Sequence, residues 1–304
     1  MSILDELGQQ MASVAQKVSA SVVRVGGGWR GGSGVVIADG VVLTNAHNVR
    51  GDGAMVVFAD GREAEATLTG VDVDGDLAVL AVDTAGAPAV AWAGTSASIG
   101  TPVFAAAAAQ GGTRVTFGFV SSVARAFRGP RGRRISGSIE HTAPLAPGSS
   151  GSALLDANGT LIGLNTNRLG GGFYLALPAD EALRNRVGSL QRGESAERPR
   201  LGIGIAPNWV ASRMRRAVGL PERDGVLVRE VEDGSPAANA GLAEGDLLVE
   251  AGGRPIHEPD DVYDALGTVK SGGTLSLRIV RGTDERSVEV SFVASSSATS
   301  GPVH

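Results

Sequence analysis

The 304-residue chain contains no cysteine, and this absence excludes disulfides, thiolate metal sites and a cysteine nucleophile. No apolar stretch approaches the roughly 18 residues of a membrane-spanning helix, so we do not expect an integral membrane protein. The opening residues, MSILDELGQQ, are acidic where a signal peptide is basic, and no apolar segment follows them. The chain as written is therefore expected to stay in the cytoplasm, unless a leader has been removed from it.

Lysine is nearly absent: of the 27 lysine and arginine residues, only Lys17 and Lys270 are lysines. The formal net charge of -5 argues against non-specific binding to nucleic acid or to anionic membranes. Hydrophobic residues make up 42% of the chain and charged residues 19%, a composition typical of a soluble globular protein. This length leaves room for two domains of ordinary size.

Residues 2–18 show the periodicity of an amphipathic helix, with apolar residues three or four positions apart. Ser2 and Asp5 have the spacing of a capping box at the start of this helix. We interpret the segment 1–20 as an N-terminal helix that packs on its own domain, with an oligomer contact as the alternative.

Short apolar runs separated by turn residues dominate the segment 21–188. Several of these turns contain ADG or ANG between β-branched runs, which is typical of β-hairpins. Short strands at this spacing, without long helices between them, indicate an all-β barrel or sandwich. The run FAAAAAQ at 104–110 could be helical by propensity, but it lies between strand signals, so we interpret it as a strand of small residues.

A second folded unit is expected after a linker. Residues 189–199 are polar and hold glycine and proline, which is typical of a linker. Residues 200–294 then combine strand-like and helix-like stretches, which predicts a compact α+β unit. The tail 295–304 has low complexity and is expected to be disordered.

Three residues of the first unit carry the strongest chemical signal. His47 ends the apolar strand in VVLTNAHNVR, Asp76 precedes the strand in DGDLAVLAV, and Ser150 lies in APGSSGSALL. Taken singly, each residue type is more often a capping or turn residue. Together they predict a relay in which an imidazole accepts the proton of a serine hydroxyl while a carboxylate orients the imidazole.

Two further features of the serine segment refine this prediction. Gly148 lets the backbone turn, so that its N–H and that of Ser150 can face a developing oxyanion. An α/β-hydrolase would instead need Gly-x-Ser-x-Gly, with Asp and then His after the serine. Here the fifth position is Ser152, and the later histidines, His257 and His304, fall outside the first unit. A lipase or esterase is therefore disfavoured.

Several segments match a known family. GSGVVIADGVVLTNAHNV, GDLAVLAV, PGSSGSALLDANGTLIGLNT and GFYLALPAD look like the chymotrypsin-fold domain of HtrA/Deg serine proteases. RLGIGI and DGVLVREVEDGSPAANAGLAEGDLLVEAGGRPI look like the PDZ domain of the same family. The resemblance runs from about Ser13 to Val293. It implies a mostly β fold, with two six-stranded barrels of a trypsin-like protease domain at 21–188 and one α+β PDZ domain at 200–294.

By position, the resemblance makes His47 the general base, Asp76 its orienting acid and Ser150 the nucleophile. The backbone N–H groups of Gly148 and Ser150 would then form the oxyanion hole. Neither a metal ion nor an organic cofactor is implied.

The resemblance also implies a peptide-binding site in the PDZ domain. Leu201, Gly202 and Ile203 match the loop that receives a peptide C-terminus, and the peptide would add there as a strand. Val262 and Leu266 on the following helix would wall the pocket for its side chain.

Pro144, Thr166 and Arg168 are the candidates for the specificity pocket. Pro144 occupies the place where a trypsin-like enzyme carries an aspartate, so cleavage after arginine or lysine is not expected. The resemblance favours small aliphatic residues before the scissile bond. Arg168 would narrow the pocket mouth or favour an acidic substrate residue, with plain solvent exposure as the alternative.

Three residues depart from the family pattern. Ser149 stands where asparagine or aspartate is usual, Ser152 replaces a glycine, and Asn48 replaces an apolar residue beside His47. Ser152 is expected to add bulk at a tight turn, and Asn48 to place a polar side chain near the base. Both changes bear on efficiency and leave the reaction type unchanged.

Assembly and regulation are also suggested by the resemblance. Family members are often trimers joined through N-terminal segments, although residues 1–25 contain no aromatic side chain to plug a neighbour. The loop 124–138 holds five arginines. It is either a solvated flexible loop or the segment that senses the PDZ domain or an activator and orders the oxyanion loop.

The resulting hypothesis is a PDZ-regulated, ATP-independent serine endopeptidase that cleaves unfolded or damaged proteins in protein quality control. The alternative is a catalytically weak, chaperone-like scaffold of the same fold that binds peptides. The expected partners are unfolded proteins or peptides, C-terminal peptides at the PDZ domain, and two further copies of the chain in a homotrimer. The resemblance places the protein in the cell envelope or periplasm, in contrast to the missing leader.

Overall fold

The computed structural model describes residues 2–27, 31–94, 96–128, 134–194, 199–269 and 272–292. The chain divides into two compact units, Met1–Ala196 and Glu197–His304. Each unit has its own hydrophobic core. Within the described residues, no helix combines the length and apolar character needed to cross a membrane.

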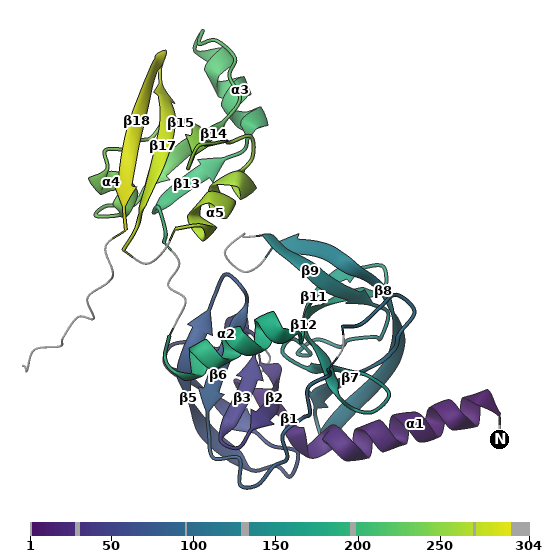
Figure 1. The fold of residues 1–304 in the computed structure, drawn as a ribbon. Helices are drawn as coiled ribbons and strands as arrows, with labels where there is room; N and C mark the ends of the chain where they lie inside the picture. Colours follow the sequence, from purple (N-terminus) through teal and green to yellow (C-terminus); the bar gives the residue numbers. More distant parts are fainter. Residues whose placement is uncertain are drawn as a thin grey trace, which may run out of the picture. The chain divides into compact units, whose positions relative to one another are not determined.

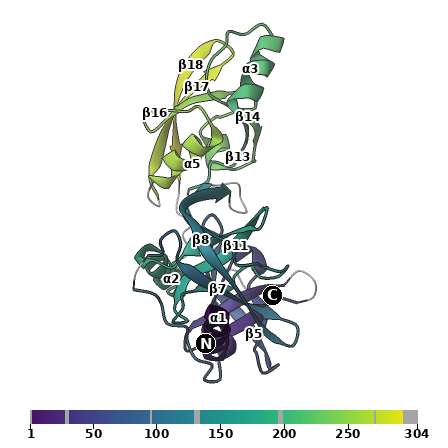
Figure 2. The same ribbon diagram turned by 90° about the vertical axis from the view of Figure 1, so that its right-hand side faces the viewer.

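The first unit begins with helix α1, Ile3–Val18, which is seen nearly along its axis in Figure 2. The hydroxyl of Ser2 accepts from the backbone N–H of Asp5, and the Asp5 carboxylate accepts from the N–H of Ser2. The predicted capping box is thus confirmed. Val14 and Val18 are buried, and α1 packs against strands β7 and β8 of its own unit.

Six strands close into the first barrel in the order β1-β2-β3-β6-β5-β4. Their bounds are β1 Val22–Val25, β2 Gly32–Ala38, β3 Val41–Thr44, β4 Gly53–Val57, β5 Glu63–Asp72 and β6 Leu77–Ala81. Pairing of Arg24 in β1 with Val57 in β4 closes the ring. The barrel interior is rich in valine, a β-branched residue that packs well on a pleated sheet.

Six more strands close into the second barrel in the order β10-β11-β12-β9-β8-β7. Their bounds are β7 Pro102–Ala109, β8 Gly112–Arg128, β9 Arg134–His141, β10 Ala153–Leu155, β11 Leu161–Gly170 and β12 Phe173–Pro178. The alanine run lies in β7, which confirms the strand predicted at 104–110. The two closed barrels confirm the two-barrel fold expected from the sequence (Figure 1).

The largest hydrophobic cluster joins the two barrels. Val35 and Leu43 of the first barrel share it with Phe104, Leu155 and Leu164 of the second. Burial of these side chains stabilises the packing of one barrel on the other. Residues on the two barrels can therefore form one site.

Helix α2, Glu181–Gln191, was not predicted from the sequence. Its buried residues Leu183, Val187 and Leu190 follow helical spacing, but charged and polar residues surround them, so the periodicity is weak. The helix contacts β5 and β6 of the first barrel (Figure 1). Its last turn extends into the segment 189–199, which we interpreted as a linker.

The second unit is an α+β domain whose strands pair in the order β13-β14-β15-β17-β18, with β16 paired to β15. The strands are β13 Ile203–Ala206, β14 Val226–Val231, β15 Leu247–Ala251, β16 Arg254–Pro255, β17 Thr274–Arg281 and β18 Asp284–Ser291. Three helices accompany them: α3 Asn208–Ala217, α4 Pro236–Asn239 and α5 Pro259–Gly267. Helix α3 was missed by sequence reasoning because its buried residues are only Ala211 and Arg215.

Candidate active site

His47 lies on the short 3-10 helix η3, Ala46–Asn48, directly after strand β3. Asn45, the residue directly before η3, is fully buried, and its side-chain amide donates to the backbone carbonyl of Asp76 at 2.9 Å. This hydrogen bond ties the segment of His47 to that of Asp76. The imidazole itself is accessible, since 38% of the side chain is exposed.

Asp76 holds the imidazole from one side. Its Oδ1 and Oδ2 lie 2.9 and 3.0 Å from Nδ1 of His47. The Thr166 hydroxyl donates to Oδ2 at 2.7 Å, and the backbone N–H of His47 donates to Oδ1 at 3.3 Å. With Nδ1–H facing a carboxylate, Nε2 keeps its lone pair for a proton.

The turn that carries Asp76 has an unusual backbone. Asp76 has φ of 55°, a left-handed value that is uncommon for residues other than glycine. Buried Asp72 holds this turn, because its Oδ1 accepts from the N–H of Gly75 at 2.8 Å. Its Oδ2 lies 3.2 Å from Nη1 of Arg186 on α2.

Sequence reasoning missed Asp72 and Arg186. The DVDGD stretch could have suggested Asp72 as a turn residue. Arg186 carried no signal, because α2 itself was not predicted.

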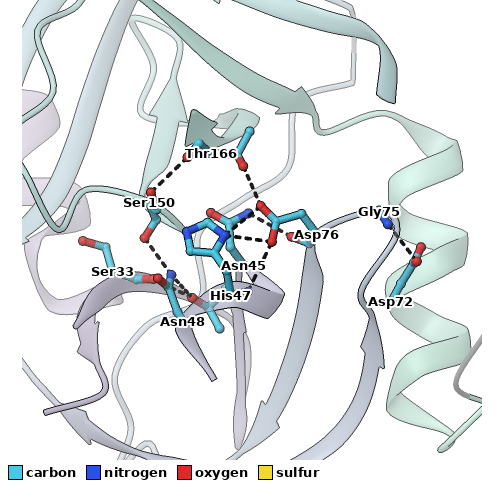
Figure 3. Close-up of polar contacts among 10 residues, drawn as sticks. Ser33, Asn45, His47, Asn48, Asp72, Gly75, Asp76, Ser150 and Thr166 are labelled. Carbon is cyan, nitrogen blue, oxygen red and sulfur yellow. Dashed lines mark hydrogen bonds and ion pairs between the residues drawn. The ribbon is translucent and has the colours of Figure 1, made fainter. Parts of the chain in front are cut away.

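Ser150 lies on the turn before β10. Figure 3 shows the imidazole of His47 between the Ser150 side chain and Asp76. The Ser150 hydroxyl donates to the Thr166 carbonyl at 2.9 Å, so it must turn away from Thr166 to give its proton to His47. Loose alignment of this kind is common before substrate binds. The three predicted residues thus meet in one place.

Hydrogen bonds from residues of the first barrel hold the turn that carries Ser150. The backbone N–H of Ser33 and the side-chain amide of Asn48 donate to the Ser150 carbonyl at 2.8 and 2.9 Å. The Ser33 hydroxyl donates to the carbonyl of Gly148 at 3.0 Å. Asn48, which was expected to disturb the base, therefore acts as an anchor for the segment of Ser150.

The backbone around Ser150 is where the sequence predicts an oxyanion hole. Gly148 has φ of 83°, and within the described part of the chain the N–H groups of Gly148 and Ser150 donate to no other group. The tightest position is Gly151, where a Cβ would lie 2.1 Å from the carbonyl oxygen of Ser33. Ser152 itself is fully buried, and its N–H donates to the carbonyl of Ser149 at 3.0 Å.

Ser152 belongs to a buried polar chain. The side-chain amide of Asn165 donates to its hydroxyl at 2.9 Å, and Oδ1 of Asn165 lies 2.9 Å from Nε2 of His141. His141 is fully buried, and its Nδ1 has no hydrogen-bond partner in the described structure. Burial lowers the pKa of His141 to about 4, so this histidine is neutral at pH 7.

The three residues predicted to form the specificity pocket differ in what the structure describes of them. Pro144 is exposed, and its carbonyl accepts from the hydroxyl of Thr116 at 2.8 Å. Thr166 is buried and contacts Asp76 and Ser150, so it also orients the relay. The backbone of Arg168 pairs with Tyr174, but its side chain lies outside the described residues. The pocket assignment stays a prediction.

The arginine-rich loop is described only in part. Residues 129–133 lie outside the described residues. Nearby, Arg125 forms an ion pair with Glu140 at 2.8 Å. The described residues contain no cluster of three or more metal-ligating side chains.

The predicted peptide-binding residues gather at one edge of the second unit. Strand β13 ends the order of the sheet, and Ile203 packs partly buried against the core that contains Leu201, Val262 and Leu266. Gly202 has φ of 73°, and a Cβ there would lie 2.3 Å from Cβ of Ser235. Only glycine fits this position.

Comparisons with known proteins agree with this architecture. Residues 32–164 match the family described as trypsin-like peptidase domain, and residues 199–292 match the PDZ domain. A probable periplasmic serine endoprotease, DegP-like, of Halomonas elongata is 32% identical over 268 residues, covering 85% of this chain and 55% of the relative. The putative serine protease HhoA of Synechocystis is 32% identical over 277 residues, covering 85% and 69%. The chain thus spans about half the length of the DegP-like relatives it matches.

Solved structures of serine proteases are also similar to this chain. The serine endoprotease from Yersinia pestis has a TM-score of 0.67 and 25% identity, with 93% of this chain and 97% of that chain covered. The HtrA-type protease AlgW with a tripeptide has a TM-score of 0.63 and 26% identity, with 92% and 95% covered.

The ion pair beneath the Asp76 turn leads to a first prediction. Arg186→Met removes the cation and leaves the Asp72 carboxylate, which is 1% exposed, buried without its charge partner. We expect the free energy of unfolding to fall by about 2 kcal/mol in urea titrations. Arg192→Met, which breaks an exposed pair with Glu194, is the control and should leave stability nearly unchanged. Equal losses in the two variants would contradict this role of Asp72 and Arg186.

The buried histidine leads to a second prediction. The pKa of His141 is about 4 when folded and about 6.5 when unfolded, so the unfolded chain binds more protons between these values. Stability should fall as pH drops through this window and stay level above it. From pH 7 to pH 5 this loss should be about 2 kcal/mol. Urea unfolding of His141→Gln should lack it, and an unchanged pH dependence in that variant would refute the assignment.

Proposed function

The chain belongs to the HtrA/Deg family of serine proteases, and from this we propose that it is a serine endopeptidase that cleaves unfolded or damaged proteins without ATP. The observation that carries the proposal is the convergence of His47, Asp76 and Ser150 across two barrels. The N–H groups of Gly148 and Ser150 support it further, because they donate no hydrogen bond within the described residues.

In the proposed reaction, Oγ of Ser150 attacks the carbonyl carbon of a peptide bond while its proton passes to Nε2 of His47. The oxyanion accepts hydrogen bonds from the N–H groups of Gly148 and Ser150. When the C–N bond breaks, the imidazolium gives its proton to the leaving amine. Water then attacks the acyl-enzyme by the same proton route and releases the second product.

Asp76 remains ionised throughout this sequence and stabilises the imidazolium. Thr166 contributes twice, because its hydroxyl fixes the carboxylate of Asp76 and its carbonyl holds the resting hydroxyl of Ser150. Asn48 and Ser152 support the enzyme over the alternative of a weak scaffold, since both are accommodated by hydrogen bonds.

Regulation by peptides is part of the proposal. The solved AlgW structure contains a tripeptide, and strand β13 lies at the edge of the sheet in this chain. A peptide C-terminus would add along β13 as a further strand, with its carboxylate received by the backbone of Leu201–Ile203. Val262 and Leu266 would contact its last side chain.

Location and assembly complete the proposal. The DegP-like relatives are named periplasmic, which supports the same compartment for this protein. Ile3 and Leu4 are 83% and 77% exposed on α1, which supports a homotrimer joined through N-terminal segments.

The nucleophile is tested by labelling with a fluorophosphonate and by digestion of an unfolded protein. Ser150→Ala should abolish labelling and reduce turnover by on the order of 10⁴-fold. Thr166→Ala is expected to keep labelling at a lower rate, because it loosens Asp76 without removing a reacting group. Labelling that persists in Ser150→Ala would move the nucleophile elsewhere, and an inert wild type would favour the scaffold.

The peptide site is tested with a peptide that ends in three valines, once with a free carboxylate and once as the amide. The Ser150→Ala protein is used, so that no cleavage interferes with the titration. The amide should bind about tenfold more weakly, because it cannot fill the anion site with a charge. Equal affinity of the two forms would contradict the proposed carboxylate loop.

A further inference from the structure

A second pocket borders the proposed oxyanion hole. It has a volume of about 280 Å³, and its lining includes Arg24, Gly31, Arg114, Pro147 and Gly148. A Cβ on Gly148 would lie 3.3 Å from the carbonyl oxygen of Gly31, so the pocket wall directly meets the oxyanion glycine.

Ser33 connects the segments that surround this pocket. Its hydroxyl donates to the carbonyl of Gly148 and accepts from the N–H of Ala108, while its own N–H donates to the carbonyl of Ser150. Strand β2, the turn of Ser150 and strand β7 therefore meet beside the reacting centre. The pocket is part of this junction.

The lining of the pocket includes Pro147 and Gly148 but neither Pro144 nor Thr166, two of the residues predicted to form the specificity pocket. In the proposed reaction, the acyl part of the substrate lies toward the predicted specificity pocket, which includes Thr166. A substrate whose carbonyl oxygen contacts the N–H groups of Gly148 and Ser150 must send its leaving-group part the other way. A pocket that borders Gly148 and is lined by neither Pro144 nor Thr166 is therefore the candidate for the leaving-group side.

The pocket carries positive charge. Arg24 on β1 and Arg114 on β8 are both exposed, and within the described residues neither guanidinium forms a hydrogen bond or an ion pair. No carboxylate is among the residues that line the pocket. In a chain of net charge -5, this is a local concentration of unpaired cations.

We propose that this pocket binds an acidic side chain of the substrate, aspartate or glutamate, within the first residues after the scissile bond. The inference rests on the proposed endopeptidase function and adds a preference on the leaving-group side. A carboxylate there would be held between two guanidinium groups contributed by different barrels.

The experiment uses two quenched fluorescent peptides that differ only in glutamate or glutamine at the second residue after the cleaved bond. Both end in an amide, so that the side chain is the only carboxylate on that side. Wild-type kcat/KM should be about fivefold higher for the glutamate peptide at low salt, and less so at high salt. Arg24→Gln with Arg114→Gln should bring this ratio to about one. Arg62→Gln, a control outside the pocket, should leave it unchanged.

A second peptide pair carries the same exchange two residues before the cleaved bond. The double variant should not change the ratio for that pair, because the pocket lies on the leaving-group side. A wild type that cleaves both forms of the first pair equally well would overturn the pocket assignment alone. A wild type that cleaves no peptide and no unfolded protein would overturn the proposed function and this inference with it.

Discussion

The packing of one barrel on the other is the constraint on which the site depends. His47 and Asp76 are carried by the first barrel and Ser150 by the second, so no single barrel holds the relay. The shared cluster that includes Leu43, Phe104 and Leu155 keeps the barrels in one arrangement. Hydrophobic burial is non-directional. The precise position of the turn of Ser150 relative to the first barrel is therefore set by hydrogen bonds that cross the junction.

Those hydrogen bonds converge on Ser33 and Asn48. Both belong to the first barrel, and both donate to the carbonyl of Ser150. Hydrogen bonds to the carbonyls of Gly148 and Ser150 hold this turn against the first barrel, while within the described residues the N–H groups of the two residues donate no hydrogen bond. Gly148 also lines the pocket that contains Arg24 and Arg114, so the turn of Ser150 borders the site proposed for an acidic side chain of the substrate.

Further polar groups, most of them buried, support two of the three residues of the proposed relay. Asp72 with Arg186 supports the turn of Asp76, and Asn165 with His141 supports the strand that follows Ser150. Buried polar chains of this kind are costly unless their hydrogen bonds are satisfied, and they specify one arrangement when they are. Burial accounts for the lowered pKa of His141 and for its neutral state at pH 7.

The sequence by itself determined the strand-rich character of the first unit, the α+β character of the second, the α1 capping box and the three residues of the proposed relay. These features depend on local spacing, turn chemistry and residue type, which a linear chain displays. Only the tertiary structure decided the roles of Thr166, Ser33, Asp72 and Arg186, because their contacts join segments distant in sequence. It also showed that the side chains of Asn48 and Ser152 are held by hydrogen bonds. The sequence could not predict these partners, because they are set by packing and not by neighbours along the chain.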